Sequence, residues 1–258
     1  MRENRIRTIW AEGGAVINGW LAIPSGFTAE AMARQGWDSL VVDLQHGLVD
    51  YQAAVGMLQG ISTTGTMPMA RVPWLEPGII MKLLDAGSYG IICPMIDTRE
   101  DAERLVDACR YAPQGHRSFG PTRALLYAGP DYPANANDTV LAIAMIETET
   151  ALENLDDITA TPGLDGVYIG PSDLSLSLGF PPTLEPTETR VVEAIEAILK
   201  SAQKNGVVAG IHCGSTARAK QMIDLGFRLV TVMSDHRLLV AAAKRTVDEL
   251  REAMATPG

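Results

Sequence analysis

Two stretches of the 258-residue chain decide the fold, Leu141-Ala-Ile-Ala-Met-Ile-Glu147 and Gly166-Val-Tyr-Ile-Gly-Pro-Ser-Asp173. Each is a short apolar run followed by a carboxylate. Such runs predict strands that are buried on both faces, as in a parallel sheet covered by helices. An acid after such a strand lies at the rim of the sheet. In a closed α/β barrel, the rim at the carboxyl ends of the strands carries the chemistry.

The rest of the chain alternates similar apolar runs with helical patterns. The expected strands are Val16–Ala22, Ser39–Asp43, Met67–Arg71, Gly90–Pro94, Leu141–Ile146, Gly166–Ile169, Val207–Ile211 and Leu229–Met233. The clearer expected helices are Thr28–Arg34, Tyr51–Ser62, Pro77–Ala86, Thr98–Arg110, Thr187–Asn205, Ser215–Leu225 and Asp235–Met254. Eight strands in βα order predict a (β/α)8 barrel in one domain over residues 1–258. An open, doubly wound sheet is the alternative.

Residues 111–140 interrupt this alternation of expected strands and helices. The segment is rich in proline and glycine and contains no evident strand. Such composition predicts a loop insertion, and a loop of this length inside a domain is usually functional or a subunit contact. A disordered surface excursion is the alternative.

Charge and composition exclude several classes of protein. The formal net charge of −10 makes nucleic-acid binding through phosphate contacts unfavourable. No apolar run is long enough to span a membrane, and the N-terminal residues are too polar for a secretory signal. The three cysteines show neither disulfide nor zinc spacing. These features predict a cytoplasmic protein that binds neither nucleic acid nor membranes.

Polar side chains gather just after the ends of the expected strands. They are Asp43, His46, Arg71, Glu147, Asp173 and His212. In a barrel, all of them would face one mouth. This convergence is a stronger indication of a site than any single residue.

Glu147 and Asp173 are the candidate metal ligands. Two carboxylates, with water and substrate oxygens, would supply the oxygen-rich shell that Mg²⁺ or Mn²⁺ prefers. Alternatively, Glu147 favours the N-terminal dipole of a following helix, and Asp173 caps a turn.

Arg71 and His46 are the candidate catalytic residues. The Arg71 guanidinium could bind a carboxylate or a developing enolate oxygen, and a salt bridge to a rim acid is the alternative. A histidine side chain can act as a general base near neutral pH, so His46 is a candidate, although a loop histidine is often merely solvated. The role of His212 stays open.

Asp85 lies at the C-terminus of an expected helix, where the dipole disfavours an acid, so a specific partner is expected. Asp224 repeats that arrangement, so the pattern is not specific. All five lysines fall in expected helices, which argues against a Schiff-base lysine on a barrel strand. A metal is therefore favoured as the electron sink.

An ordered set of motifs covers nearly the whole chain. It comprises Val42-Asp-Leu-Gln-His46, Arg71, Ile80-Met-Lys-Leu-Leu-Asp-Ala-Gly87, Ile92-Cys-Pro-Met95, Arg117-Ser-Phe-Gly120, Ala144-Met-Ile-Glu-Thr148 and Tyr168-Ile-Gly-Pro-Ser-Asp173. This set resembles the HpcH/HpaI aldolase family of metal-dependent (class II) pyruvate aldolases, such as 4-hydroxy-2-oxoheptanedioate aldolase. The resemblance implies a barrel of the phosphoenolpyruvate/pyruvate-domain type. It also implies a homo-oligomer, commonly a hexamer built as a trimer of dimers.

The resemblance also implies residue roles. Glu147 and Asp173 would hold Mg²⁺ or Mn²⁺, with Co²⁺ and Zn²⁺ as alternatives, and the ion would chelate the substrate's carboxylate and keto oxygens. Arg71 would stabilise the enolate, and His46 paired with Asp85 would act as base. Backbone groups at Gly170 and Ser172 would hold the carboxylate.

The expected reaction is reversible cleavage of a 4-hydroxy-2-oxo acid to pyruvate, or a related 2-oxo acid, and an aldehyde. The alternatives are oxaloacetate decarboxylation, an acyl-CoA lyase, and a non-catalytic oxo-acid-binding protein. Gln45 stands where many family members have Glu, which could alter the tuning of His46. Arg117 and Arg123 could bind an anionic aldehyde tail, and surface ion pairs are an equal alternative.

Overall fold

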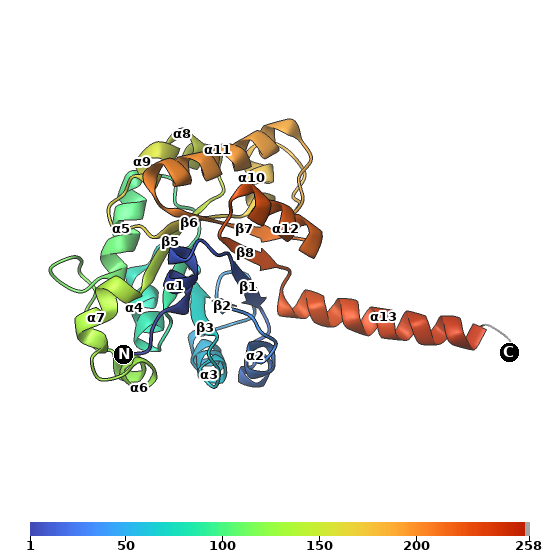
Figure 1. The fold of residues 1–258 in the computed structure, drawn as a ribbon, viewed down its shortest axis with the longest axis horizontal. Helices are drawn as coiled ribbons and strands as arrows, with labels where there is room; N and C mark the ends of the chain where they lie inside the picture. Colours follow the sequence, from blue (N-terminus) through green and yellow to red (C-terminus); the bar gives the residue numbers. More distant parts are fainter. Residues whose placement is uncertain (256–258) are drawn as a thin grey trace.

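The computed structural model describes residues 1–255, and its centre is a closed parallel barrel with the strands in chain order (Figure 1). The strands are β1 (Val16–Leu21), β2 (Ser39–Asp43), β3 (Met67–Arg71), β4 (Gly90–Cys93), β5 (Leu141–Ile146), β6 (Gly166–Ile169), β7 (Val208–Cys213) and β8 (Leu229–Val232). The predicted (β/α)8 barrel is therefore confirmed. Strands β2, β3, β5 and β6 have the predicted bounds.

Helices separate the strands along the described chain. They are α1 (Arg5–Ala11), α2 (Gly26–Ala33), α3 (Tyr51–Ile61), α4 (Pro77–Asp85), α5 (Arg99–Cys109), α6 (Thr122–Ala128), α7 (Tyr132–Thr139), α8 (Glu149–Glu153), α9 (Leu155–Thr159), α10 (Pro171–Ser177), α11 (Thr189–Asn205), α12 (Thr216–Leu225) and α13 (Asp235–Ala255). The expectation of a loop over residues 111–140 was wrong, because α6 and α7 occupy much of it. Pro121 is the N-cap of α6, and a proline lies in the first turn of α7, positions where proline suits a helix start.

Side-chain alternation along the strands divides the core in two. In β5, Ile143 and Met145 point into the barrel, whereas Ala142 and Ala144 face the helices. Successive side chains of a strand point to opposite faces, so the next inward position after Met145 is Glu147. Met69 in β3 places Arg71 inward in the same way. The two-residue alternation of side chains along the strands therefore points Glu147 and Arg71 toward the barrel axis.

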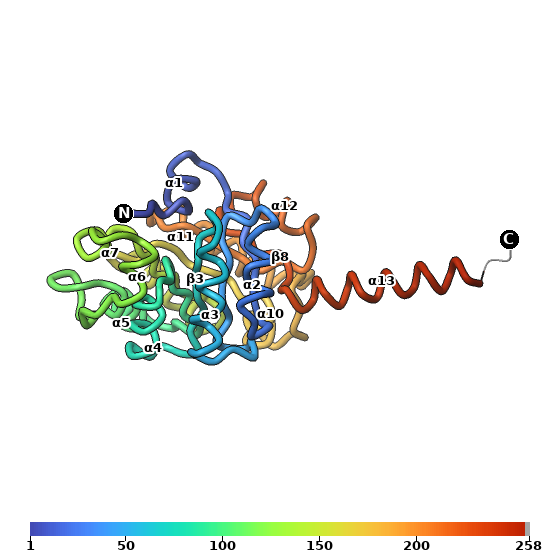
Figure 2. The backbone as a smooth tube through the Cα atoms, turned by 90° about the horizontal axis from the view of Figure 1, so that it is seen from below, coloured from blue at the N-terminus to red at the C-terminus, as the bar shows by residue number. Residues whose placement is uncertain are grey.

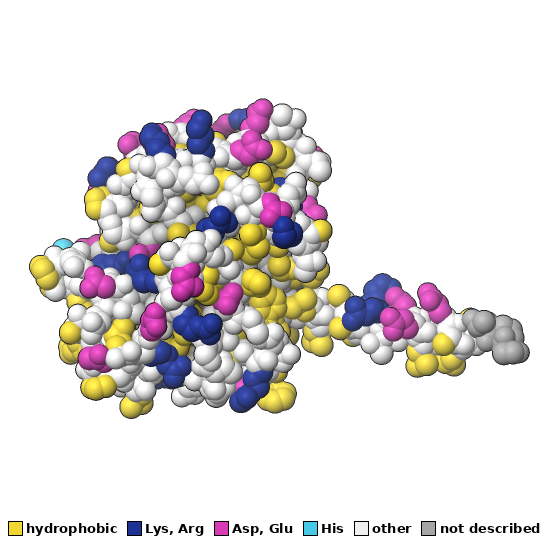
Figure 3. Space-filling model, in the orientation of Figure 1, with side chains coloured by type: hydrophobic (Ala, Val, Ile, Leu, Met, Phe, Trp, Pro, Cys, Tyr) yellow, Lys and Arg dark blue, Asp and Glu magenta, His cyan; other side chains and the backbone are white. Residues whose placement is uncertain are grey.

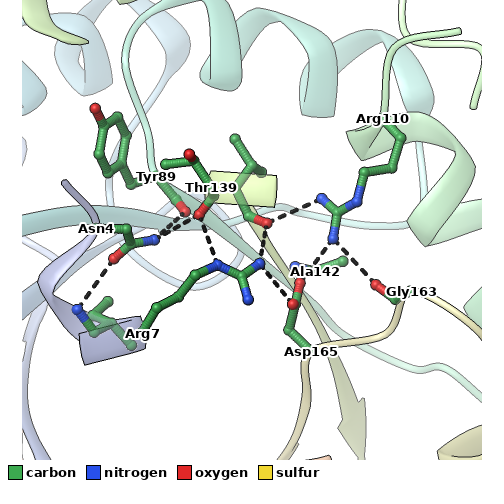
Figure 4. A network of polar contacts seen from close by, with 10 residues as sticks. Asn4, Arg7, Tyr89, Arg110, Thr139, Ala142, Gly163 and Asp165 are labelled. Atoms are coloured by element: carbon green, nitrogen blue, oxygen red, sulfur yellow. Dashed lines mark hydrogen bonds and ion pairs between the residues drawn. The ribbon is translucent and has the colours of Figure 1, made fainter. Parts of the chain in front are cut away.

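A polar network ties the loops at the amino end of the barrel together (Figure 4). Asp165 accepts hydrogen bonds from Arg7 (2.7 Å) and Arg110 (2.8 Å). Arg110 also donates to the carbonyl oxygens of Val140 and Gly163. Because these residues flank β5 and β6, the network fixes where both strands begin.

Helix α13 extends away from the barrel instead of packing on it (Figures 1 and 2). Asp235 anchors its first turn by accepting the backbone N–H groups of Ala22 and Ile23. Asp235 is the only buried residue of the helix. On the barrel, Ile17 of β1 is 48% exposed, which is unusual for an outward strand position in this fold. The surface beside β1 thus lacks a covering helix.

Among the described helices, none combines the length and the apolar character that a bilayer crossing requires.

Candidate active site

A cavity of about 230 Å³ opens at the carboxyl ends of the strands. Its lining includes Trp20, Asp43, His46, Arg71, Tyr168, Gly170, Ser172, Asp173, His212 and Arg237. Five of the residues predicted for the site, His46, Arg71, Gly170, Ser172 and Asp173, therefore line one pocket. Glu147 lies directly behind Gly170, whereas Asp85 is not part of the lining.

Arg71 is clamped beside the pocket by Asp43. The two residues are register partners in the β2–β3 ladder, so their side chains emerge next to each other. Nε donates to Oδ1 at 2.8 Å and one terminal nitrogen, Nη2, donates to Oδ2 at 2.7 Å. The guanidinium also lies 4.9 Å from the Trp20 ring centroid. Within residues 1–255, the other terminal nitrogen, Nη1, has no hydrogen-bond acceptor, so it is free to bind a substrate oxygen.

Asp43 also organises the loop that carries His46. It accepts the indole N–H of Trp20 at 3.1 Å and the backbone N–H groups of Gln45 and His46. Burial alone would raise the pKa of Asp43, but the bonds to Arg71 and these donors lower it below its usual range. The carboxylate therefore stays charged and holds both Arg71 and the His46 loop.

Glu147 is a buried carboxylate, 2% exposed, directly behind the Gly170 wall of the pocket. Burial and the nearby charge of Asp173 raise its pKa to about 7, although a hydrogen bond from the Met95 N–H lowers it. Met95 has a left-handed backbone with φ of 54°, and its N–H donates to Oε1 at 2.9 Å. Thr148, not Glu147, caps the following helix. The helix-dipole alternative for Glu147 is therefore not supported.

The donor set fits a hard divalent cation that also binds substrate. A Cβ at Gly170 would lie 2.5 Å from Oε2 of Glu147, so only glycine lets this carboxylate reach the loop that leads to Asp173. Among residues 1–255, no cluster of three or more His, Cys, Asp or Glu side chains could hold a metal. Glu147 and Asp173 would supply two oxygen ligands, and water and substrate oxygens would supply the others, as is usual for Mg²⁺.

The expected pairing of His46 with Asp85 does not occur within this chain. Asp85 instead accepts a hydrogen bond from Arg117 at 2.7 Å, and the Arg117 side chain is fully buried. Arg117 is therefore the partner that was expected for Asp85 from its position at a helix C-terminus. His46 lines the pocket without Asp85 beside it.

Arg117 and Arg123 do not line the pocket, so the aldehyde-tail hypothesis is not supported by this chain. Arg117 also donates to the hydroxyl of Tyr132 at 3.0 Å. Arg123 donates to the carbonyl oxygen of Ala86 at 2.6 Å and to Ser62 at 2.5 Å. Both side chains connect α6, α7 and the preceding segment to α3 and α4.

The sequence did not identify Trp20, Tyr168 and Arg237 as pocket residues. Trp20 stacks on Tyr168 with ring centroids 5.6 Å apart, and both line the cavity. A signal existed for the first two, because each occupies an inward position of a predicted strand. His212, whose role the sequence left open, lies in the same wall, 5.2 Å from Trp20.

Comparison with known proteins agrees with this arrangement. Residues 19–242 match the family described as HpcH/HpaI aldolase/citrate lyase. The chain belongs to this family. A hydroxypyruvate/pyruvate aldolase from Rhizorhabdus wittichii is 44% identical to it over 96% of this chain and 99% of that protein. A 4-hydroxy-2-oxo-heptane-1,7-dioate aldolase from Escherichia coli is 34% identical over 94% of this chain and 93% of its own length.

Solved structures show the same similarity. An HpcH/HpaI aldolase/citrate lyase family protein from Burkholderia cenocepacia superposes with a TM-score of 0.90 at 31% identity, covering 96% of this chain and 99% of that one. Family membership and the aldolase relatives identify the protein as a carbon–carbon lyase, an aldolase. The pocket at the mouth is its candidate active site.

Proposed function

We propose that the protein is a divalent-metal-dependent aldolase that reversibly cleaves 4-hydroxy-2-oxo acids to an aldehyde and pyruvate or hydroxypyruvate. One observation carries this proposal. Arg71 is clamped with a free donor edge in the same pocket as Asp173, and Glu147 lies directly behind its wall. The relatives named above act on donors of this class, which supports the choice of substrate.

The ion would be held by Glu147 and Asp173, with Mg²⁺ or Mn²⁺ favoured by the all-oxygen donors and Co²⁺ or Zn²⁺ as alternatives. When bound, it supplies positive charge that draws electrons toward the keto oxygen. The backbone N–H groups in the first turn of α10, at Ser172 and Asp173, have no acceptors within the helix. They would orient the substrate carboxylate beside Gly170.

Arg71 stabilises the charge that develops on the keto oxygen. Its Nη1 edge donates to this oxygen, while Asp43 prevents the guanidinium from turning away. A donor held in place before the reaction loses little energy to reorganisation, which makes it effective at the transition state.

His46 moves the proton. In the cleavage direction it would accept the proton of the C4 hydroxyl, directly or through one water molecule, and it would return a proton in the synthetic direction. Its position on the loop held by Asp43 places it at the pocket wall. Because Asp85 of the same chain is bound to Arg117, we assign it no role beside this histidine.

Metal depletion tests this proposal. Protein treated with a chelator should lose the ability to release pyruvate from 4-hydroxy-2-oxoheptanedioate, and Mg²⁺ or Mn²⁺ should restore it. Coupled lactate dehydrogenase measures the pyruvate. Turnover that is insensitive to the chelator, or no release with any metal, would contradict the proposal.

We infer that the protein is a homo-oligomer in which copies exchange α13. The apolar residues Leu239, Val247, Leu250 and Met254 are all exposed and recur at helical spacing along one stripe. The barrel beside β1 leaves Ile17 open, at the place where an eighth helix would pack. Figure 3 shows apolar side chains both on α13 and on the adjoining barrel surface.

A second copy satisfies both features at once, because its α13 can cover this barrel while it receives α13 in return. Leu239→Glu combined with Leu250→Glu should therefore shift the protein toward monomers in light scattering coupled to size-exclusion chromatography. The double variant Arg245→Glu/Asp248→Lys on the same helix serves as a control. An unchanged mass for the apolar double variant would contradict the exchange. The hexamer expected from the family resemblance stays a proposal.

A cytoplasmic location is supported by the cysteines. Cys93, Cys109 and Cys213 are all buried and unpaired. Free thiols are typical of proteins from reducing compartments.

A further inference from the structure

A chain of polar side chains crosses the interior of the barrel and ends at the pocket. Ser39 donates to Asn18 at 2.7 Å, and Asn18 donates to Thr231 at 2.8 Å. The Tyr168 hydroxyl donates to the same Thr231 oxygen at 2.7 Å and lies 3.3 Å from Nδ1 of His212. The first four residues are fully buried, and His212 forms part of the pocket wall.

The direction of these hydrogen bonds determines the tautomer of His212. A hydroxyl has one proton, and Tyr168 uses it toward Thr231. The Tyr168 oxygen can therefore only accept from His212, so Nδ1 carries the proton. In a neutral imidazole the other nitrogen then has a free lone pair. Nε2 of His212 is thus a hydrogen-bond acceptor, with no donor to it among residues 1–255.

The surroundings keep this ring neutral. Burial and the positive charges of Arg71 and Arg237 lower the pKa of His212 to about 4, against a smaller opposite effect of Asp43. A protonated ring would place another positive charge beside two arginines. At neutral pH the pocket therefore has a fixed neutral acceptor in this wall.

The position of His212 indicates what this acceptor would bind. His212 and Arg71 line the same cavity and both contact the Trp20 ring, so His212 lies in the part of the pocket where Arg71 would bind the keto oxygen. Arg71 can only donate hydrogen bonds, and the carboxylates of Glu147 and Asp173 are assigned to the metal. A donor group on the carbon beside the ketone would find its acceptor in His212.

We propose that His212 is a specificity-determining residue that accepts a hydrogen bond from a hydroxyl on C3 of the oxo-acid donor, and thereby favours 3-hydroxy-2-oxo acids over pyruvate. This inference rests on the proposed function and extends it to donor choice. His212 is half-buried in the pocket wall, and once a bound donor excludes water, an acceptor left without a hydrogen bond is unfavourable. The site therefore discriminates against a donor that lacks the hydroxyl.

Donor competition tests the inference. kcat/KM is measured for hydroxypyruvate and for pyruvate, each with propanal, an acceptor without a hydroxyl group of its own. His212→Phe keeps an aromatic ring against Trp20 but removes the acceptor. The ratio of kcat/KM for hydroxypyruvate to that for pyruvate should fall by about 10- to 100-fold. His116→Phe, at an exposed histidine paired with Asp107, should leave the ratio unchanged.

Two further measurements separate recognition from a structural role. His212→Gln keeps an acceptor and should retain more of the donor preference than His212→Phe. Long-range ¹H–¹⁵N spectra of the wild type should show His212 protonated at Nδ1 only, and Tyr168→Phe should remove this preference.

An equal loss for both donors, an unchanged ratio, or a proton on Nε2 in the wild type would overturn the inference. If the wild type turns over both donors in any of these cases, the proposed aldolase function survives. If the metal-loaded wild type turns over neither donor, the proposed function fails and the inference fails with it.

Discussion

Two of the buried arginine–aspartate pairs among the described residues lie at opposite ends of the same barrel. At the amino end, Arg110 binds Asp165 and two carbonyl oxygens, and Arg7 binds Asp165 from the other side (Figure 4). At the carboxyl end, Arg71 makes a two-point contact with Asp43 and leaves one donor edge toward a cavity. Both are arginine–aspartate ion pairs, but of the two arginines only Arg71 keeps a donor edge toward a cavity.

This difference separates stabilisation from catalysis in physical terms. Both terminal nitrogens of Arg110 bind protein oxygens, so that guanidinium fixes strand positions. Within residues 1–255, the Nη1 edge of Arg71 has no protein acceptor and points to the cavity. A charged group that is held rigidly and keeps a donor edge toward a cavity indicates a functional role.

The same substitution should lower activity at one pair and stability at the other. The larger effect is expected for activity, at Arg71. Arg71→Lys keeps the charge but loses the planar fork. We expect kcat/KM to fall by about 10²- to 10³-fold, as on loss of a preorganised transition-state donor. The pyruvate-release assay checks this. A rate within threefold of the wild type would remove Arg71 from the mechanism.

Arg110→Lys should instead lower stability. A lysine cannot reach Val140, Gly163 and Asp165 together, so the free energy of unfolding should fall by about 2–4 kcal/mol. Urea denaturation measures this, and kcat/KM of the folded variant should stay within about twofold. If activity fell as far as in Arg71→Lys, the proposed separation between the two ends would be wrong.

Gly170→Ala tests whether the space left by the missing side chain at Gly170 is needed to position Glu147. The added Cβ would lie 2.5 Å from Oε2 and 3.2 Å from Cε of Met145. Displacement of the carboxylate should weaken Mn²⁺ binding, followed by calorimetry, by about 10- to 100-fold. Gly56→Ala in α3, where a Cβ has nothing within 4 Å, is the matched control and should bind normally. Equal affinities for the two variants would show that Glu147 does not depend on this gap.

The smallest expected effect is the contribution of His212 to the pH dependence of stability. His212 has a pKa lowered to about 4 from 6.5 in the folded protein, so the unfolded chain takes up a proton first as pH falls. Stability should be unaffected by this group above about pH 6.5 and should decline toward pH 4 by about 1–3 kcal/mol. Denaturation of the wild type and His212→Phe at pH 7.5 and pH 4.5 measures the difference. Parallel losses in both would contradict this role.

The sequence predicted the barrel well because buried strands have short, bounded apolar runs. It also placed Glu147 and Arg71 at the rim, because each lies at the carboxyl end of a predicted strand. The segment 111–140 was predicted wrongly because its prolines were interpreted as residues that interrupt helices. Pro121 and Pro133 in fact lie where α6 and α7 begin.

Contacts between distant segments could not be predicted in the same way. The bond between Arg71 and Asp43 depends on the register of β2 against β3, which no local pattern specifies. Asp85 was correctly expected to have a partner. Its pairing with Arg117 depends on how the segment preceding α6 folds back onto α4, which no local pattern specifies, and the pairing of His46 with Asp85 stays a prediction.

The most direct test of the account is solvent exchange at the methyl group of pyruvate. In D₂O, with Mg²⁺ and no aldehyde, ¹H NMR should show the wild type replacing the methyl protons by deuterium. Exchange should stop in chelator-treated protein and in Glu147→Gln, and it should be slowed by at least about 100-fold in Arg71→Lys. Exchange that persists without metal, or that is absent in the metal-loaded wild type, would contradict the central claim that this mouth activates an oxo acid.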